Sequence, residues 1–182
     1  MAANQRQTLI VSFKIEDNLR FLSHKETSAM LQRALVRSGI PLSYSQGFNP
    51  RPRMSLPLPR SVGVLSDDEI LCAQVSDEIQ RDESALFEAI FAQLPAGCSI
   101  SELYLKEGKF KLQAAGACYR FMLKVSSIND RLLSNIDRVA DACEKKVPLI
   151  VRRQSGKKKP KDVDVSRYLE RVRIEKESVY FD

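Results

Sequence analysis

The chain has 182 residues, a hydrophobic content of 43%, a charged content of 29% and a formal net charge of +6. These values are typical of a globular chain and exclude a largely disordered one. No apolar stretch approaches the roughly 18 residues that span a bilayer, and the N-terminus has no apolar signal core. We therefore expect a cytoplasmic protein without a membrane partner, built from two half-size units.

Charge is unevenly distributed along the chain. Lys and Arg outnumber Asp and Glu by 9 to 3 in residues 1–60 and by 18 to 11 in residues 107–182. Residues 61–106 carry 2 basic and 9 acidic side chains. Two basic segments thus flank an acidic one, which favours a basic face able to meet a polyanion.

The first predicted elements are a strand and a helix. Residues 8–15 are apolar and rich in β-branched side chains, which indicates a strand buried on at least one face. Ser23 and Glu26 have the spacing of a capping box, so a helix should begin at about His24. Gly39 is expected to end that helix.

The next segments complete a first α+β unit. Residues 40–66 hold most of the chain's prolines, which favours short strands around a shaped loop. The patterns then predict a strand over 68–75, a helix over 82–94 and a strand over 98–105. This order matches a ferredoxin-like βαββαβ unit, which we assign to residues 1–106.

The second unit, residues 116–182, follows a connector at 107–115 and repeats the order strand, helix, strand, strand. Its expected elements are a strand at 117–125, a helix that begins near Ser127–Asp130 and runs to Cys143, a strand at 148–152, a lysine-rich turn at 155–161 and one or two strands between 163 and 181. A complete ferredoxin-like unit would need another helix and strand after Phe181. We therefore expect either a truncated chain or an incomplete second unit.

The cysteines indicate buried thiols. Cys72, Cys98, Cys118 and Cys143 are scattered in apolar contexts, and the chain has one histidine. We expect four buried thiols and neither a disulfide framework nor a zinc site. Because phosphate-binding glycine loops, nucleophile elbows and iron–sulfur spacings are also absent from the sequence, we expect no metal, no cofactor and no autonomous cofactor enzyme.

Candidate binding chemistry is concentrated in the loop Tyr44-Ser-Gln-Gly-Phe-Asn-Pro-Arg-Pro-Arg53. Its prolines fix their own φ angles and favour extended neighbours, so Arg51 and Arg53 should project to one side of a stiff segment. Two guanidinium groups placed in this way suit successive phosphates, and an aromatic ring of the loop could stack on a base. The alternative is that both arginines pair with the acids of residues 67–83.

A second basic feature lies at the predicted start of the first helix. His24 is the only histidine, and Arg20 and Lys25 lie close to it in sequence. Amide donors at a helix N-terminus attract anions, so these side chains could bracket a phosphate. Two alternatives are that His24 is an ordinary first-turn residue, or that it serves as a general acid or base in RNA cleavage.

Several motifs together carry a family resemblance. They are Arg20-Phe-Leu-Ser-His24, the segment from Leu35 to Pro41, the loop from Tyr44 to Arg53, and Ser55-Leu-Pro-Leu-Pro59 with Val62-Gly63. From about Leu9 to its end the chain resembles the bacterial radical-SAM-linked domain of unknown function, of the DUF2344 type. The resemblance implies a role near RNA maturation or modification, together with a radical-SAM partner protein, and it supplies no known reaction.

We therefore hypothesise a noncatalytic RNA-binding accessory domain linked to a radical-SAM partner, with rRNA or tRNA preferred over DNA. One alternative is a metal-independent endoribonuclease that uses His24. Another is a protein–protein adaptor for a radical-SAM enzyme. The expected nucleic-acid contacts are Arg20, His24, Lys25, Tyr44, Gln46, Phe48, Asn49, Arg51 and Arg53.

Overall fold

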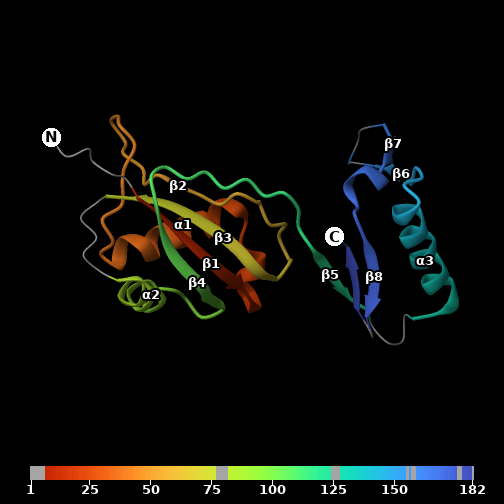
Figure 1. Ribbon diagram of the computed structural model, residues 1–182, viewed down its shortest axis with the longest axis horizontal. Coiled ribbons are helices and arrows are strands. Elements are labelled where there is room, and N and C mark those ends of the chain that lie inside the picture. The colour runs from red at the N-terminus through yellow and green to blue at the C-terminus, as the bar shows by residue number, and fades with distance from the viewer. Residues whose placement is uncertain are drawn as a thin grey trace. The chain divides into compact units, whose positions relative to one another are not determined.

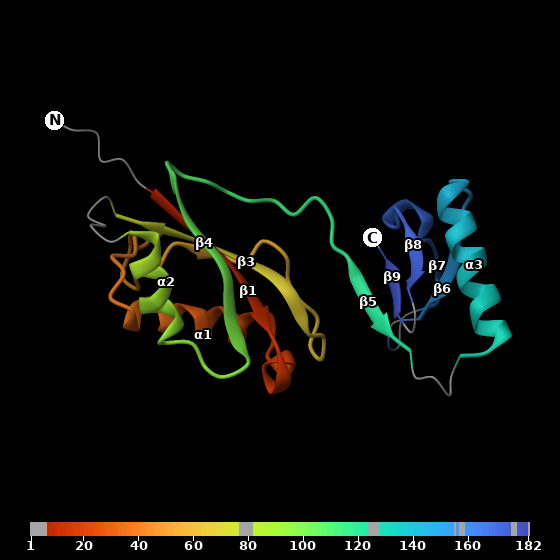
Figure 2. The same ribbon diagram turned by 60° about the horizontal axis from the view of Figure 1, so that its bottom comes forward.

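The chain forms two compact units, Met1–Ala114 and Ala115–Asp182. The structure is a computed structural model, shown in Figures 1 and 2. It describes residues 7–76, 82–123, 128–154, 156, 159–175 and 178–181.

The first unit is an antiparallel sheet with two helices. Its elements are β1 (Gln7–Ile15), the 3-10 helix η1 (Asp17–Phe21), α1 (His24–Arg37), β2 (Met54–Ser55), β3 (Ser66–Val75), α2 (Glu83–Phe91) and β4 (Cys98–Glu107). The strands lie in the order β2-β3-β1-β4, and each neighbouring pair is antiparallel. This confirms the expected α+β class, and the order is compatible with a ferredoxin-like unit.

The predicted capping box at the start of α1 is confirmed. The backbone N–H of Glu26 donates to Ser23 Oγ over 3.3 Å, and the backbone N–H of Ser23 donates to Glu26 Oε2 over 2.8 Å. Two backbone amides that lack a partner within the helix are thereby satisfied, so the helix starts at His24 as the sequence predicts.

Period-two alternation on β1 directs one set of side chains into the core. Leu9 and Phe13 are fully buried in this set. Leu35 of α1 and Leu86 of α2 pack against the same cluster. Both helices therefore cover one face of the sheet (Figure 2).

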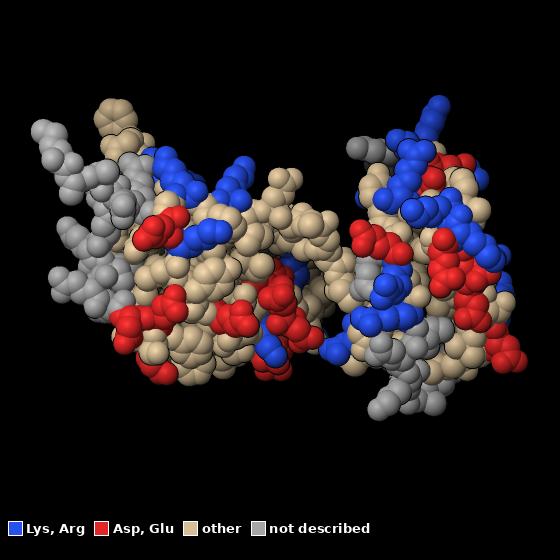
Figure 3. All heavy atoms as spheres, viewed as in Figure 1, with Lys and Arg blue, Asp and Glu red and all other residues tan. Residues whose placement is uncertain are grey.

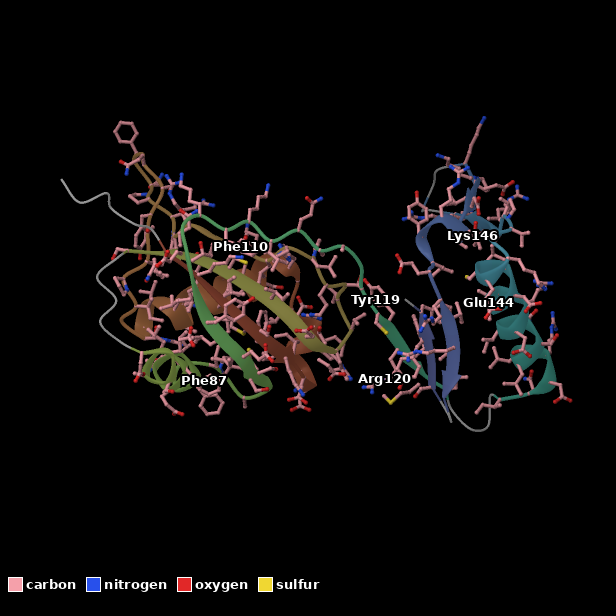
Figure 4. All side chains as sticks on the ribbon, in the orientation of Figure 1. Phe87, Phe110, Tyr119, Arg120, Glu144 and Lys146 are labelled. Atoms are coloured by element: carbon pink, nitrogen blue, oxygen red, sulfur yellow. The ribbon has the colours of Figure 1, made fainter. Side chains whose placement is uncertain are left out.

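The opposite face is partly covered by the segment that follows β4. Thr8 Oγ1 donates to the carbonyl of Gly108 over 2.9 Å and accepts from the N–H of Phe110 over 3.1 Å. The backbone N–H of Leu112 donates a hydrogen bond to the Cys72 sulfur. Ile10, on the same face, is 1% exposed. Residues 107–114 thus lie along this face as part of the first unit, where Figure 4 labels Phe110.

The second unit places one helix on a three-stranded sheet. Its elements are β5 (Tyr119–Met122), α3 (Asp130–Glu144), β6 (Ile150–Arg153), β7 (Lys161–Asp164), the 3-10 helix η3 (Ser166–Tyr168), β8 (Val172–Glu175) and β9 (Ser178–Phe181). Strands β5, β9 and β8 form one sheet in that order, and β6 and β7 form a separate two-stranded hairpin. Ile136 and Cys143 of α3 pack against Val172 and Val179. The N-cap is Asn129, whereas Ser127 lies outside the described residues.

The two units share an order of elements. In each, a strand and a helix are followed by a hairpin and then by two strands, the second of which pairs with the first strand of the unit. The sheet orders β2-β3-β1 and β8-β9-β5 correspond. The hairpins that occupy this shared place are residues 42–53 and the β6–β7 hairpin.

One cysteine differs from expectation. Cys72, Cys98 and Cys143 are buried, and burial raises the pKa of the Cys98 thiol to about 12. Cys118 is exposed, so the prediction of four buried thiols was wrong. Cys118 lies just before the short edge strand β5, where little chain is available to cover it.

The hydroxyl of Thr8 should hold the segment after β4 against the sheet. Thr8→Val keeps the side-chain shape but leaves the Gly108 carbonyl and the Phe110 amide without their partner, so we expect a loss of about 1–3 kcal/mol in unfolding free energy. Urea denaturation measures this loss. Thr27→Val is the matched control, because Thr27 Oγ1 is buried without a hydrogen bond among the described residues. That variant should be neutral or more stable, and equal losses in both variants would contradict the assignment.

Candidate functional site

The proline-rich loop forms a hairpin at the edge of the first sheet. The N–H of Ser43 donates to the Gln74 carbonyl, and the N–H of Gln74 donates to the Arg53 carbonyl, each over 2.8 Å. Across the hairpin, the N–H of Ser45 donates to the Arg51 carbonyl over 2.8 Å. We call residues 42–53 the basic hairpin. It continues the edge of the sheet past the last residues of β3 (Figure 1).

The tip of the basic hairpin presents polar and aromatic groups to solvent. Gly47 has a φ of +129°, a value that a side chain would strain, and the next residue, Phe48, has a relative exposure of 105%. Gln46 and Asn49 are exposed as well. Tyr44 lies lower, at the bridge to Pro52, and is 43% exposed. The apolar surface of a fully exposed phenyl ring is removed from water only when a binding partner covers the ring.

The two arginines of the hairpin differ in their attachments. Arg53 Nε donates to the Tyr44 carbonyl over 3.1 Å, which holds that side chain along the hairpin. The N–H of Arg51 donates to Ser45 Oγ, while its guanidinium group is exposed. Within the part of the chain that the structure describes, neither guanidinium forms an ion pair with a carboxylate. Residues 77–81, which include two of the acids proposed as partners, lie outside that part.

Two lysines join this end of the unit, although sequence reasoning treated them only as part of a connector. Lys109 and Lys111 are exposed, whereas Phe110 and Leu112, which alternate with them, are half-buried and bonded to the sheet through their backbone amides. Cys72, which bonds to Leu112, is two residues from Gln74, to which the basic hairpin is attached. Figure 3 shows basic side chains gathered along this side of the first unit. The alternation of basic and apolar residues in Lys-Phe-Lys-Leu, residues 109–112, is the sequence signal that could have predicted an extended segment with both lysines on one side.

We call Arg51, Arg53, Lys109 and Lys111 the basic surface. These cations come from two segments that are distant in sequence and are both fixed to the same sheet. The cations exposed there can bind successive phosphates without a large ordering cost.

The other predicted contacts lie at the opposite end of β3. His24 and Lys25 occupy the first turn of α1 and are exposed, and Arg20 stacks on Phe21 with its guanidinium carbon 4.8 Å from the ring centre. His24 is close enough to influence Glu69 electrostatically. From Glu69 to Gln74 the strand advances roughly 17 Å. The structure therefore separates the basic hairpin from the helix start, so the predicted contacts fall into two groups.

A buried arginine, Arg60, connects several segments at the end of β3 that carries Glu69. The side chain of Arg60 is 7% exposed, and its guanidinium donates to the carbonyls of Arg20 over 2.8 Å and Leu22 over 3.2 Å. It also donates to Val64 within its own loop. Arg60 Nε lies 3.8 Å from Glu69 Oε1, whose side chain is 12% exposed. Arg60 thus connects η1, the loop after β2 and β3, a role that no sequence pattern indicated.

Glu69 has a perturbed carboxyl group. Burial raises its pKa above the ordinary 4.5, while a hydrogen bond from Ser66 and the charges of Arg60 and His24 oppose the shift. The carboxylate is thus engaged by Arg60 and Ser66 inside the fold. Glu69 therefore serves a structural role, as the buried partner of Arg60.

The chain belongs to a family described as an uncharacterized protein conserved in bacteria (DUF2344), whose family model matches residues 8–181. None of the curated proteins matches the chain. Among the described residues, no group of three or more His, Cys, Asp or Glu side chains could hold a metal ion. No helix in the same residues has the length and apolarity to cross a membrane.

Removal of Arg60 should destabilise the protein strongly. Arg60→Ala leaves a buried carboxylate unpaired, for which we expect a loss of about 3–5 kcal/mol in unfolding free energy. Adding Glu69→Gln to that variant removes the charge and should recover part of the loss, because the carbonyls of Arg20 and Leu22 still lack their donor. A double-mutant cycle in urea measures both contributions. Full recovery would contradict a role for the carbonyl contacts.

The raised pKa of Glu69 sets the direction of a pH effect. Because the unfolded chain loses this proton at a lower pH than the folded one, the contribution of Glu69 to stability falls as pH rises above about 4.5. Stability of Glu69→Gln relative to wild type should therefore increase over that range. Glu26→Gln is the control of opposite sign: hydrogen bonds from Ser23 lower the pKa of Glu26, so its stability relative to wild type should decrease as pH rises toward about 4.5. Parallel trends in the two variants would contradict the assignment.

Proposed function

We propose that the chain binds RNA through the basic hairpin and the neighbouring lysines of the basic surface. The observation that carries this proposal is the tip of the hairpin, where Phe48 is fully exposed beside Arg51. An exposed aromatic ring next to cations is the combination that single-stranded nucleic-acid sites use, because the ring stacks on a base while the cations meet the backbone.

The position of the ring favours unpaired nucleotides. Bases inside a duplex are covered on both faces by their neighbours, so Phe48 can stack only on a base that is splayed out in a loop, bulge or single strand. Gln46 and Asn49 flank the ring and offer amide donors and acceptors for base edges. Structured RNA with exposed loops, such as rRNA or tRNA, supplies such bases.

Within the first unit, the basic hairpin is a better RNA-binding surface than the face of the sheet opposite the helices. Phe110 and Leu112 lie on the face opposite the helices, where Thr8 and Ile10 are each 1% exposed. A base cannot stack on side chains that are already covered. The basic hairpin has no such cover among the described residues.

The proposal is of a noncatalytic accessory role, with a radical-SAM protein as the partner that the motif resemblance implies. The alternative reaction at His24 could use Glu69, which His24 influences electrostatically, but that carboxyl is engaged by Arg60 and Ser66. A carboxyl group held in this way is not placed to exchange a proton with a bound RNA. We therefore propose binding without cleavage.

Loss of the hairpin arginines should weaken RNA binding in a salt-dependent way. For Arg51→Ala with Arg53→Ala we expect weaker binding to a fluorescent RNA stem–loop and a decrease of about 1–2 in the slope of log affinity against log salt, because each phosphate contact releases counterions. Phe48→Ala should weaken binding roughly 5- to 100-fold and leave the slope unchanged. Anisotropy titrations at several salt concentrations measure both quantities.

Arg33→Ala is the matched control, because Arg33 is exposed on α1 away from the basic surface. It should retain wild-type affinity. The proposal fails if wild-type binding is absent at low salt or if affinity does not depend on salt. RNA cleavage in the presence of chelator, lost in His24→Ala, would instead favour the enzyme alternative.

A further inference from the structure

The β6–β7 hairpin occupies the same place in the second unit as the basic hairpin does in the first. The basic hairpin follows α1 and precedes β2 and β3, and the β6–β7 hairpin follows α3 and precedes β8 and β9. Figure 4 labels Glu144 and Lys146 where α3 ends and the chain turns toward this hairpin. The two units thus place a hairpin at one topological position.

Charges are sorted between the two faces of the β6–β7 hairpin. Arg152 lies directly opposite Asp162, so this face carries a pair of opposite charges. On the other face Arg153 lies directly opposite Lys161, and both side chains are exposed. Residues directly opposite in an antiparallel pair have Cβ atoms about 5 Å apart, where like charges repel. The pair therefore disfavours the hairpin, and an anion bound between the two cations would remove this repulsion.

The nearby carboxylate of Asp164 does not fill this role. Asp164 Oδ1 accepts from the N–H of Leu149 over 3.1 Å and from Ser166 Oγ over 2.7 Å. Its Oδ2 lies 3.4 Å from Arg167 Nε. Along β7, Asp164 also points to the same face as Asp162, away from the face of Lys161.

We propose that Arg153 and Lys161 bind a backbone phosphate of RNA, so that the chain holds RNA through one basic hairpin in each unit. The ligand class rests on the proposed function, whereas the site is distinct from the basic surface. A phosphate oxygen accepts from the planar guanidinium and from the ammonium group together and removes their mutual repulsion. Val151 and Val163, in the next row of the same face, supply apolar surface beside the cations.

A second site has a consequence for RNA length. Two sites on one chain convert the second contact into an intramolecular step, so an RNA long enough to reach both binds more tightly than a short one. The gain should disappear when either hairpin loses its cations. Length dependence thus distinguishes two linked sites from one.

The test compares two single-charge variants of the full chain. Arg153→Gln and Arg152→Gln remove the same charge from opposite faces of one strand. With a long fluorescent oligouridylate at low salt, we expect Arg153→Gln to bind several-fold more weakly, with a salt slope lower by about 1, and Arg152→Gln to match wild type. With a short oligouridylate that fills one site, Arg153→Gln should change affinity much less.

Thermal unfolding gives a second readout. In the absence of RNA and at low salt, Arg153→Gln should unfold at a higher temperature than wild type, because it removes a like-charge pair. The long oligouridylate should reverse that order. Equal unfolding temperatures of wild type and Arg153→Gln under both conditions would overturn the inference.

The outcomes separate this inference from the proposed function. If Arg153→Gln and Arg152→Gln bind alike while Arg51→Ala with Arg53→Ala binds weakly, the basic hairpin stands and the β6–β7 site falls. If Arg153→Gln alone weakens binding, the β6–β7 site stands and the basic hairpin falls. Absence of binding by wild type overturns both.

Discussion

The pairing of β1 with β3 is the constraint on which the arrangement of the first unit depends. Strand β1 lies between β3 and β4, and its side chains are buried on both faces, so β3 has one possible register. That register decides where each end of β3 lies. One end carries the basic hairpin through Gln74, and the other carries Glu69, to which Arg60 is paired.

The buried Arg60 has a structural role, because its guanidinium group bonds to backbone carbonyls inside the first unit and is not available to a ligand at the surface. A guanidinium group offers five donors in a fixed plane, so one side chain can satisfy carbonyls from several segments. Arg60 does so at the end of the sheet farthest from the basic hairpin. The same residue type is thus a structural anchor at one end of β3 and a proposed phosphate contact at the other.

The second unit reuses the element order of the first without its second helix among the described residues. In both units a hairpin follows the helix, and in both it carries arginines. The β6–β7 hairpin forms a sheet of its own, and the basic hairpin is attached to β3 by hydrogen bonds at its base. A hairpin in this place can change its surface residues with little effect on the core, which suits a binding element.

Local signals in the sequence determined the helix starts, the proline-rich loop and the α+β class. Capping at Ser23 depends on neighbours three residues apart, and alternation along β1 depends on a period of two, so both are readable without the fold. The family followed from the motifs around residues 20–63. The amino-acid sequence alone thus determined which residues are basic, stiff or aromatic.

Only the tertiary structure decided which of those residues lie together. It separated His24 and Arg20 from the basic hairpin, brought Lys109 and Lys111 to the hairpin's end of the unit, and placed Arg153 opposite Lys161. Each of these relations depends on strand register or on a hydrogen bond between distant segments. Such contacts carry no signature in a single sequence, because the residues that make them are set by packing of the whole unit.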